Sequence, residues 1–205
     1  MTWFGSPRNA SMGYSIAAWR AAGDCLLKIS LLAILSFHAG VRAQSIDGVQ
    51  EYRLKAAFIY NFSQFIEWPA GSFASPDSPF PICVVGDDPF GDALLALQKR
   101  SYQGRRIVIS YPKTAAEARS CRILYVDNPL KTAQWREFDK VLSDVPVLTV
   151  SSGEDVVSSG ICIGFVPREG KIRWTLNLGA ARRAQLKISA KLIEIAVAIV
   201  GETTR

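Results

Sequence analysis

Four short apolar runs, separated by segments of helical pattern, constrain the fold of this chain more than any other feature. The first run, "FPICVVG" at 80–86, is rich in β-branched residues and carries no charge, which is typical of a strand buried on both faces. The other runs lie at 105–111, 122–127 and 145–152. Strands that alternate with helices at this spacing predict βαβ units and therefore an α/β fold with a parallel sheet.

The C-terminal part predicts a change of strand direction. The runs "GICIGFVP" (160–167) and "KIRWTLNL" (171–178) are separated only by "REG", a spacing typical of a β-hairpin. In the second run Ile172, Trp174 and Leu176 alternate with polar residues, so we expect one face of this strand to be buried. The parallel sheet should therefore gain an antiparallel strand at its C-terminal edge.

The segment 181–200 predicts a final helix with Leu186, Ile193 and Val197 among its core residues. Because no linker or repeat interrupts the pattern, we expect residues 44–205 to form a single domain. The predicted architecture is a three-layer sandwich. It consists of a mostly parallel sheet with helices on both faces and an antiparallel C-terminal edge strand.

Residues 1–43 have the pattern of a secretory signal peptide. Basic residues precede an apolar run at 29–37, and "HAGVRA" then provides a small-residue exit that ends at Ala43. This run is too short to cross a bilayer, which takes about 20 apolar residues. We expect export to the periplasm and cleavage near Ala43; the alternative is a membrane anchor or a buried helix.

The residues after position 43 favour binding over catalysis. They hold 20 Lys and Arg against 17 Asp and Glu, a balance too mild to predict a nucleic-acid partner. The only histidine of the chain, His38, precedes them, so we expect no histidine to act as general base or metal ligand. The sequence also lacks the G-x-S-x-G, CxxC and phosphate-loop motifs. We therefore expect neither an enzyme nor a metal or cofactor site.

Three acidic residues offer an alternative to this interpretation. Asp87 and Asp88 follow the first predicted strand and Asp127 ends the third, at the edge where α/β proteins bind ligands. Response-regulator receivers have this layout and use it to hold magnesium and accept phosphate. The structural alternative is that these acids begin helices, because a proline follows both Asp88 and Asp127 within two residues.

Three cysteines, Cys83, Cys121 and Cys162, follow the predicted cleavage site. The first and third strands of a doubly wound sheet are commonly neighbours, so the sulfurs of Cys83 and Cys121 are expected to be able to meet. Such a bridge would be either a structural staple or a redox sensor. Cys162 has no obvious partner, and we expect it to be a buried free thiol.

The stretch "EYRLKAAFIYNFSQFIEWP" (51–69) predicts an unusually apolar helix that ends at Pro69. Leu54, Phe58 and Phe62 lie on one helical face, and a second apolar stripe runs beside them. Together these faces exceed what a surface helix normally buries. We therefore expect the second stripe to form a partner or dimer surface; it consists of Tyr52, Ile59 and Ile66.

Several sequence blocks together resemble the YfiR family of periplasmic proteins. They span residues from about 50 to 198 and are "EYRLKAAFIYNFSQFIEWP", "ICVVGDDPFG", "GRRIVI", "CRILYV", "VLTVS", "GICIGFV", "KIRWTLNL" and "LKISAKLIEIA". The resemblance implies an exported α/β protein that forms homodimers. It also implies repression of a membrane-bound diguanylate cyclase through the periplasmic sensor domain of that enzyme, with an outer-membrane lipoprotein as a further partner.

The same resemblance implies a redox-sensitive disulfide between Cys83 and Cys121. Cys162 matches one half of a second bridge in the family. The other half is missing from this chain, because the segment "SGEDVVSSG" that precedes Cys162 contains no cysteine.

On these grounds we expect a periplasmic regulatory protein that represses a membrane-bound signalling enzyme through protein–protein contact tuned by redox state. The enzyme would be a diguanylate cyclase or another membrane sensor protein. The alternative is a periplasmic small-molecule binding or uptake module, which would hold its ligand in an apolar cleft. A magnesium-dependent phosphoacceptor built on the three acidic residues is the third hypothesis. No ligand-binding residue is predicted.

Overall fold

The computed structural model describes residues 48–127 and 133–201, together with Met1, and the predicted signal peptide lies outside these residues. The helices are α2 (Gly48–Ser63), α3 (Asp92–Leu95), α4 (Ala115–Ala118), α5 (Ala133–Leu142), α6 (Leu178–Arg183) and α7 (Ala190–Glu194), with the 3-10 helices η2 (Ala96–Lys99) and η3 (Val156–Ser159). The strands are β1 (Ile66–Glu67), β2 (Phe80–Val85), β3 (Ser101–Tyr102), β4 (Arg105–Ser110), β5 (Ile123–Val126), β6 (Leu148–Ser152), β7 (Ile163–Arg168), β8 (Lys171–Asn177), β9 (Lys187–Ile188) and β10 (Ala198–Val200).

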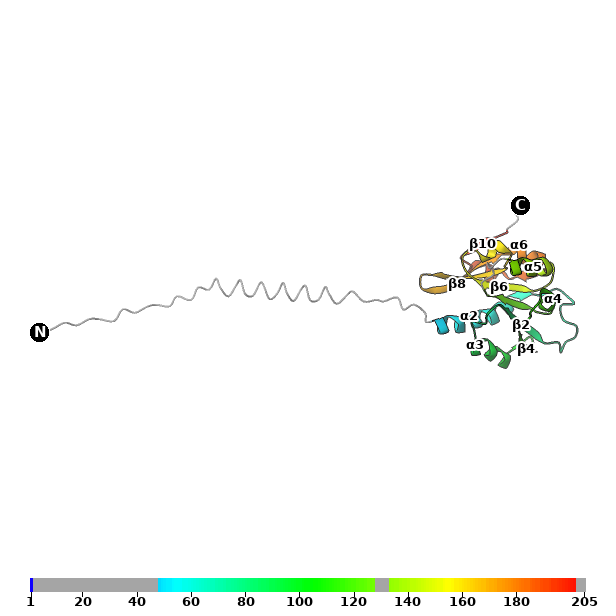
Figure 1. Ribbon diagram of the computed structural model, residues 1–205, viewed down its shortest axis with the longest axis horizontal. Helices are drawn as coiled ribbons and strands as arrows, with labels where there is room; N and C mark the ends of the chain where they lie inside the picture. The colour runs from blue at the N-terminus through cyan, green and yellow to red at the C-terminus, as the bar shows by residue number, and fades with distance from the viewer. Residues whose placement is uncertain (2–47, 128–132, 202–205) are drawn as a thin grey trace. The chain divides into compact units, whose positions relative to one another are not determined.

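Eight of these strands form one mixed, mostly parallel sheet in the order β10-β8-β7-β6-β5-β2-β4-β3 (Figure 1). The first predicted strand, β2, lies between the second and third, β4 and β5, as expected. Strands β5, β6 and β7 continue in parallel, and β8 then turns back along β7 as an antiparallel hairpin. The predicted α/β fold is confirmed.

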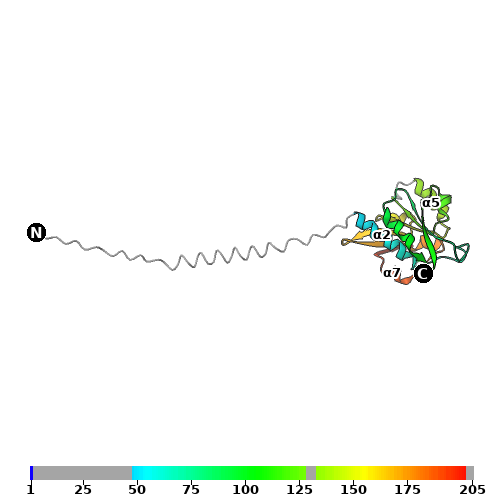
Figure 2. The same ribbon diagram turned by 90° about the horizontal axis from the view of Figure 1, so that it is seen from below.

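The sheet separates two hydrophobic clusters, because alternate residues of each strand point to opposite faces. On β2 and β5, Val84 and Tyr125 belong to the cluster that α2 and α3 cover, whereas Cys83 and Leu124 belong to the cluster that α4 and α5 cover. Figure 2 shows α2, in cyan, and α5, in yellow-green, as two helices well separated from each other. The prediction of helices on both faces is therefore confirmed.

The first helix ends earlier than predicted. The expected end was Pro69, but α2 ends at Ser63. The hydroxyl of Ser63 donates a hydrogen bond to the carbonyl oxygen of Tyr60 at 2.6 Å. The chain then extends into β1, where Ile66 lies opposite Ile188 of β9 in a two-stranded antiparallel sheet. This pairing joins segments more than 100 residues apart, so local helical periodicity did not reveal it.

The predicted helix over 181–200 is also wrong, because the chain there forms the end of α6 and then β9, α7 and β10. Helix α6 ends at Arg183, and Gln185, two residues further on, has a left-handed conformation with φ of 57°. The next N–H, of Leu186, donates back to the carbonyl oxygen of Ala181 at 2.9 Å, an arrangement that closes many helix C-termini.

Strand β10 corrects the predicted edge of the sheet. It pairs in parallel with β8, with Ile199 opposite Leu176, so the antiparallel strand β8 is internal and β10 is the edge. Of the core residues predicted for this segment, Leu186 is buried, Ile193 is partly buried and Val197 is exposed.

Candidate functional site

A disulfide joins Cys83 on β2 to Cys121, two residues before β5, with a Cα–Cα distance of 6.0 Å. The predicted pairing is thus present. The exposed fractions of the two residues are 0% and 1%, and the Oγ of Ser110 lies 3.2 Å from the sulfur of Cys83. Because neither sulfur reaches the surface of the folded domain, this geometry fits a structural staple.

Cys162 is a free and buried thiol, in agreement with the sequence. Its backbone N–H donates a hydrogen bond to the Oγ1 of Thr149 at 2.9 Å. Burial raises the pKa of the Cys162 thiol, which keeps the sulfur protonated and unreactive at neutral pH.

Two of the three acidic residues at the carboxyl ends of the strands, Asp88 and Asp127, have separate structural contacts. The carboxylate of Asp88 accepts hydrogen bonds from the backbone N–H of Phe90 and the hydroxyl of Tyr111, both at 2.8 Å. Asp88 therefore caps the turn before α3, while Asp127 packs closely on Gly86. Among the described residues, no group of three or more His, Cys, Asp or Glu side chains is arranged to hold a metal ion.

The stripe predicted as a partner surface is mostly core, so this prediction is wrong for two of its three residues. Ile59 is 0% exposed and Ile66 is 3% exposed. Tyr52 is partly buried, and its ring meets the edge of the Phe90 ring at a centroid distance of 5.4 Å. Helix α2 packs on a part of the sheet that includes both β7 and β8, so more of the circumference of the helix is buried than its periodicity suggested.

The aromatic residues of α2 pack on these two strands. Phe58 and Phe62 each lie 5.3 Å from the ring of Trp174 on β8, and Phe62 stacks on Phe165 of β7 at 5.6 Å. Most of the excess apolar surface of this helix is therefore satisfied within the domain. The surface that α2 leaves open lies on its other side, toward α3.

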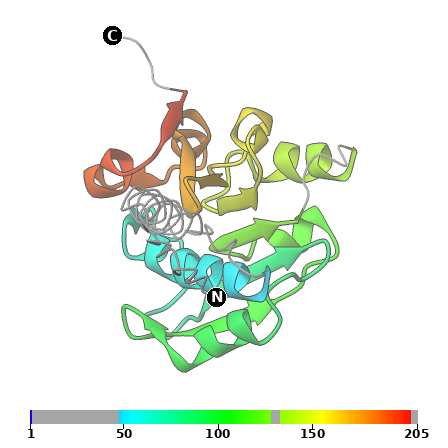
Figure 3. The same ribbon diagram turned by 90° about the vertical axis from the view of Figure 1, so that its left-hand side faces the viewer.

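An open groove of about 980 Å³ lies between α2 and the α3–η2 segment. Figure 3 shows α2 in cyan with the green α3–η2 segment beside it. The lining residues are Arg53, Ala56, Ala57, Tyr60 and Asn61 from α2, and Asp92, Ala93, Ala96, Leu97, Lys99 and Arg100 from α3 and η2. Four of them are alanines, whose small side chains would allow the backbone of another helix to approach closely.

The rim of this groove is basic. Arg53, Lys99 and Arg100 contribute three positive charges against the single negative charge of Asp92. The guanidinium of Arg100 lies over the Tyr60 ring, 5.1 Å from its centroid, and the Tyr60 hydroxyl donates to the carbonyl oxygen of Ser101 at 3.2 Å. A groove with a floor of small apolar side chains and a basic rim is chemically suited to an amphipathic helix with acidic flanks.

Sequence reasoning did not find this groove. Its alanines have no strong hydrophobic pattern, and Lys99 and Arg100 resemble ordinary surface charges. The one signal was the pair Ala56-Ala57 on the most aromatic helix of the chain, because two small residues among large ones indicate a close approach.

Fold and site together define a small α/β domain with a helix-lined groove. Over residues 52–197 the sequence matches the YfiR/HmsC-like family, so the chain belongs to the YfiR/HmsC-like family. No curated protein matches the sequence. Among solved structures, the chain is similar to a conserved domain protein from Vibrio cholerae O1 biovar El Tor str. N16961, with 11% identity and a TM-score of 0.42. The match covers 72% of this chain and 60% of that structure. Within the described part of the chain, no helix is long and apolar enough to span a bilayer.

Proposed function

We propose that this protein is a periplasmic regulator that represses a membrane-bound diguanylate cyclase by direct contact. Membership of the YfiR/HmsC-like family supports the class of function. The α2/α3 groove, with its alanine floor and basic rim, is the observation that supports direct contact with a partner. Its proposed occupant is an acidic amphipathic helix in the periplasmic region of the cyclase.

Repression requires that the protein bind the inactive state of the cyclase more tightly than the active state. Helix α2 is fixed to the sheet through Phe58 and Phe62, and η2 is fixed through the buried Leu97. The groove walls are thus held by the core, and a rigid groove discriminates between partner conformations better than a mobile one.

Because both sulfurs are buried, a reductant reaches the disulfide only when the domain opens locally, and we propose this opening as the route for redox tuning. Cys83 and Cys121 lie on the face opposite α2, so reduction would act on the groove through the stability of the β2–β5 pair. A less stable sheet holds α2 less firmly, and we propose that this weakens repression.

The test is cellular cyclic di-GMP in a strain that lacks the gene and in the same strain with the gene restored. We expect the level to rise on deletion and to fall on restoration with the wild-type protein. The Ala57→Glu and Ala96→Glu variants should fail to lower the cyclic di-GMP level, because each places a long, negatively charged side chain in the groove at an exposed position.

Ala116→Glu on α4 is the matched control, because this alanine is exposed on the opposite face of the sheet. Immunoblotting confirms that all variants accumulate equally. An unchanged level on deletion would exclude repression of a cyclase. Normal repression by Ala57→Glu would exclude the groove while leaving the function intact.

A further inference from the structure

A second cavity, of about 370 Å³, lies at the carboxyl ends of β6 and β7, on the side where α2 begins. Open α/β sheets bind ligands at this edge, and small-molecule sites in proteins have volumes from about 300 to 1,000 Å³. The lining combines Ser152 and Gly153 from the end of β6, the β7–β8 hairpin, and two charged residues of α2, Glu51 and Lys55.

Lys55 is the unusual member of this lining, because its side chain is only 6% exposed. Its ammonium lies 2.5 Å from a carboxylate oxygen of Glu51, 4.5 Å from the centroid of the Tyr52 ring and 5.9 Å from that of Phe165. A buried ammonium is costly unless it is paired and hydrogen-bonded. The packing of an ordinary surface lysine therefore does not explain the position of Lys55.

Glu51 satisfies only part of this need. An ammonium has three N–H donors, and among the described residues Glu51 is the one ion-pair partner of Lys55. The Glu51 side chain is 39% exposed, so water weakens its attraction to the buried charge. The charged lining residues, Lys55, Lys171 and Glu51, have a net charge of +1, which favours an anionic group in the cavity.

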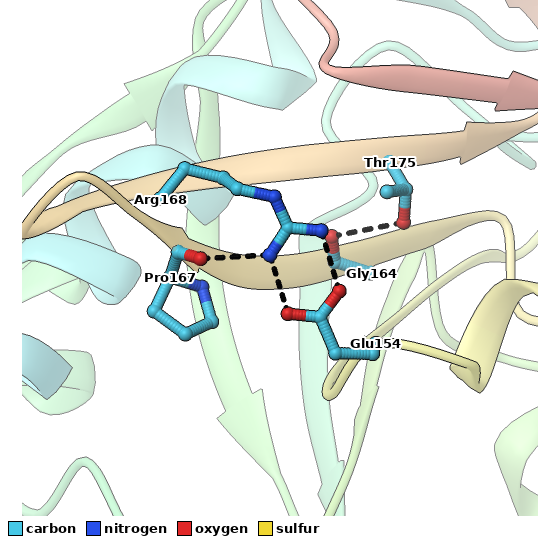
Figure 4. Close-up of polar contacts among 5 residues, drawn as sticks. All are labelled: Glu154, Gly164, Pro167, Arg168 and Thr175. Atoms are coloured by element: carbon cyan, nitrogen blue, oxygen red, sulfur yellow. Dashed lines mark hydrogen bonds and ion pairs between the residues drawn. The ribbon is translucent and has the colours of Figure 1, made fainter.

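The wall of the cavity that the β7–β8 hairpin forms is largely apolar. Phe165, Val166 and Ile172 are buried in the β7–β8 hairpin. Next to them, Arg168 binds both carboxylate oxygens of Glu154, at 2.5 and 2.6 Å, and donates to the carbonyl oxygen of Pro167 at 2.8 Å (Figure 4). This ion pair links the loop after Gly153 to β7 beside the cavity.

We infer that this cavity binds a small carboxylic acid with an apolar body. The carboxylate accepts hydrogen bonds from the Lys55 ammonium, and the apolar body packs on the β7–β8 hairpin. The site is distinct from the α2/α3 groove, because the two share no lining residue. It shares α2 with the groove, so an occupied cavity is positioned to influence partner binding.

The test uses octanoate as the probe, followed by NMR of the protein starting at Gln44. We expect a dissociation constant on the order of 1 mM or lower, with shift changes at the backbone amides of Gly153, Phe165 and Ile172. Octan-1-ol has the same chain without the charge and should bind at least about tenfold more weakly. Equal binding of the two probes, or no shift change at these amides, would overturn the inference.

Two substitutions test the role of the ammonium. Lys55→Met keeps the length and the buried stem, and we expect it to weaken octanoate binding at least about tenfold. Glu51→Gln removes the competing carboxylate and should tighten binding. This second variant keeps the test decisive if Lys55→Met fails to fold, because misfolding cannot make octanoate bind more tightly.

Lys191→Met is the control, because Lys191 is an exposed residue of α7 that does not line the cavity. It should bind octanoate as the wild type does. Weakened or unchanged binding by Glu51→Gln would contradict the inferred pairing. The binding readout does not involve cyclic di-GMP, so its outcome is separate from that of the proposed repression.

Discussion

Cys83 and Cys121 are 38 residues apart in sequence, and their disulfide links β2 to the segment just before β5 on the face covered by α4 and α5. A crosslink across a loop of this length restricts the unfolded chain, and the chain-entropy relation gives about 4 kcal/mol. Replacing both cysteines with alanine should lower the free energy of unfolding in urea by about this amount. Reduced wild-type protein should unfold at nearly the same urea concentration as the double variant. A loss well below 1 kcal/mol would show that the bridge is not a staple.

The thiol of Cys162 should be inert in the folded protein. Its burial and its raised pKa both keep the reactive thiolate scarce. In protein starting at Gln44, we expect the thiol reagent DTNB to detect far less than one thiol per chain under native conditions. In denaturant without reductant it should detect one, since the disulfide holds the other two cysteines. Rapid native reaction would contradict the burial.

Gly164 on β7 has no room for a side chain. A Cβ at this position would lie 2.7 Å from Cγ2 of Val156 and 2.9 Å from Oγ1 of Thr175. We expect Gly164→Ala to lower the free energy of unfolding by about 1 to 3 kcal/mol through overpacking. Gly48→Ala at the start of α2 is the control, because a Cβ there meets nothing within 4 Å. Equal stability of the two variants would argue against the close contact.

Tyr111 should make stability depend on pH in the alkaline range. Burial, and then the hydrogen bond to Asp88 and its charge, raise the pKa of Tyr111 from 10.0 to about 12. Because the folded-state pKa is the higher one, the stabilising contribution is complete below about pH 10 and is lost as the pH rises toward 12. The residue is 42% exposed, so solvent keeps the effect small.

Urea unfolding at about pH 9 and about pH 11.5 measures this loss, and Tyr111→Phe should show a smaller loss than the wild type. Absorbance titration of the phenolates in both proteins identifies the missing group. The alkaline loss will not vanish in the variant, because burial also raises the pKa values of Tyr52, Tyr102 and Tyr125. Identical losses in both proteins would refute the assignment.

The central strands could be predicted because their residues carry the information locally. Runs such as Ile82–Val85 are short, apolar at every position and rich in β-branched residues, a pattern typical of a strand buried on both faces. The short strands β1, β9 and β10 were missed because their partners are distant in sequence. Ile66 becomes a strand residue only through its pairing with Ile188, and Ile199 only through Leu176.

The candidate sites were harder to predict than the fold. Cysteine spacing in the predicted sheet identified the Cys83–Cys121 pair, since it required only the order of three strands. The groove and the second cavity depend on how α2 lies on the sheet. Helical periodicity places Ile59 and Ala57 on opposite sides of α2, but it does not show which side meets the sheet. Ile59 is buried there, and Ala57 is exposed in the groove. Lys55 was overlooked because a lysine four residues after a glutamate usually forms a solvated surface pair.

Helix α2 precedes every strand of the main sheet, yet its aromatic rings pack on the last two strands before the C-terminal segment. Phe58 meets Trp174 and Phe62 meets Phe165, contacts that span more than 100 residues of chain. Contacts between residues so far apart in sequence require the closure of a long loop, which costs conformational entropy and slows folding. The face of the core under α2 is therefore completed only after β7 and β8 are in place. Until then the most aromatic segment of the protein remains without its partners.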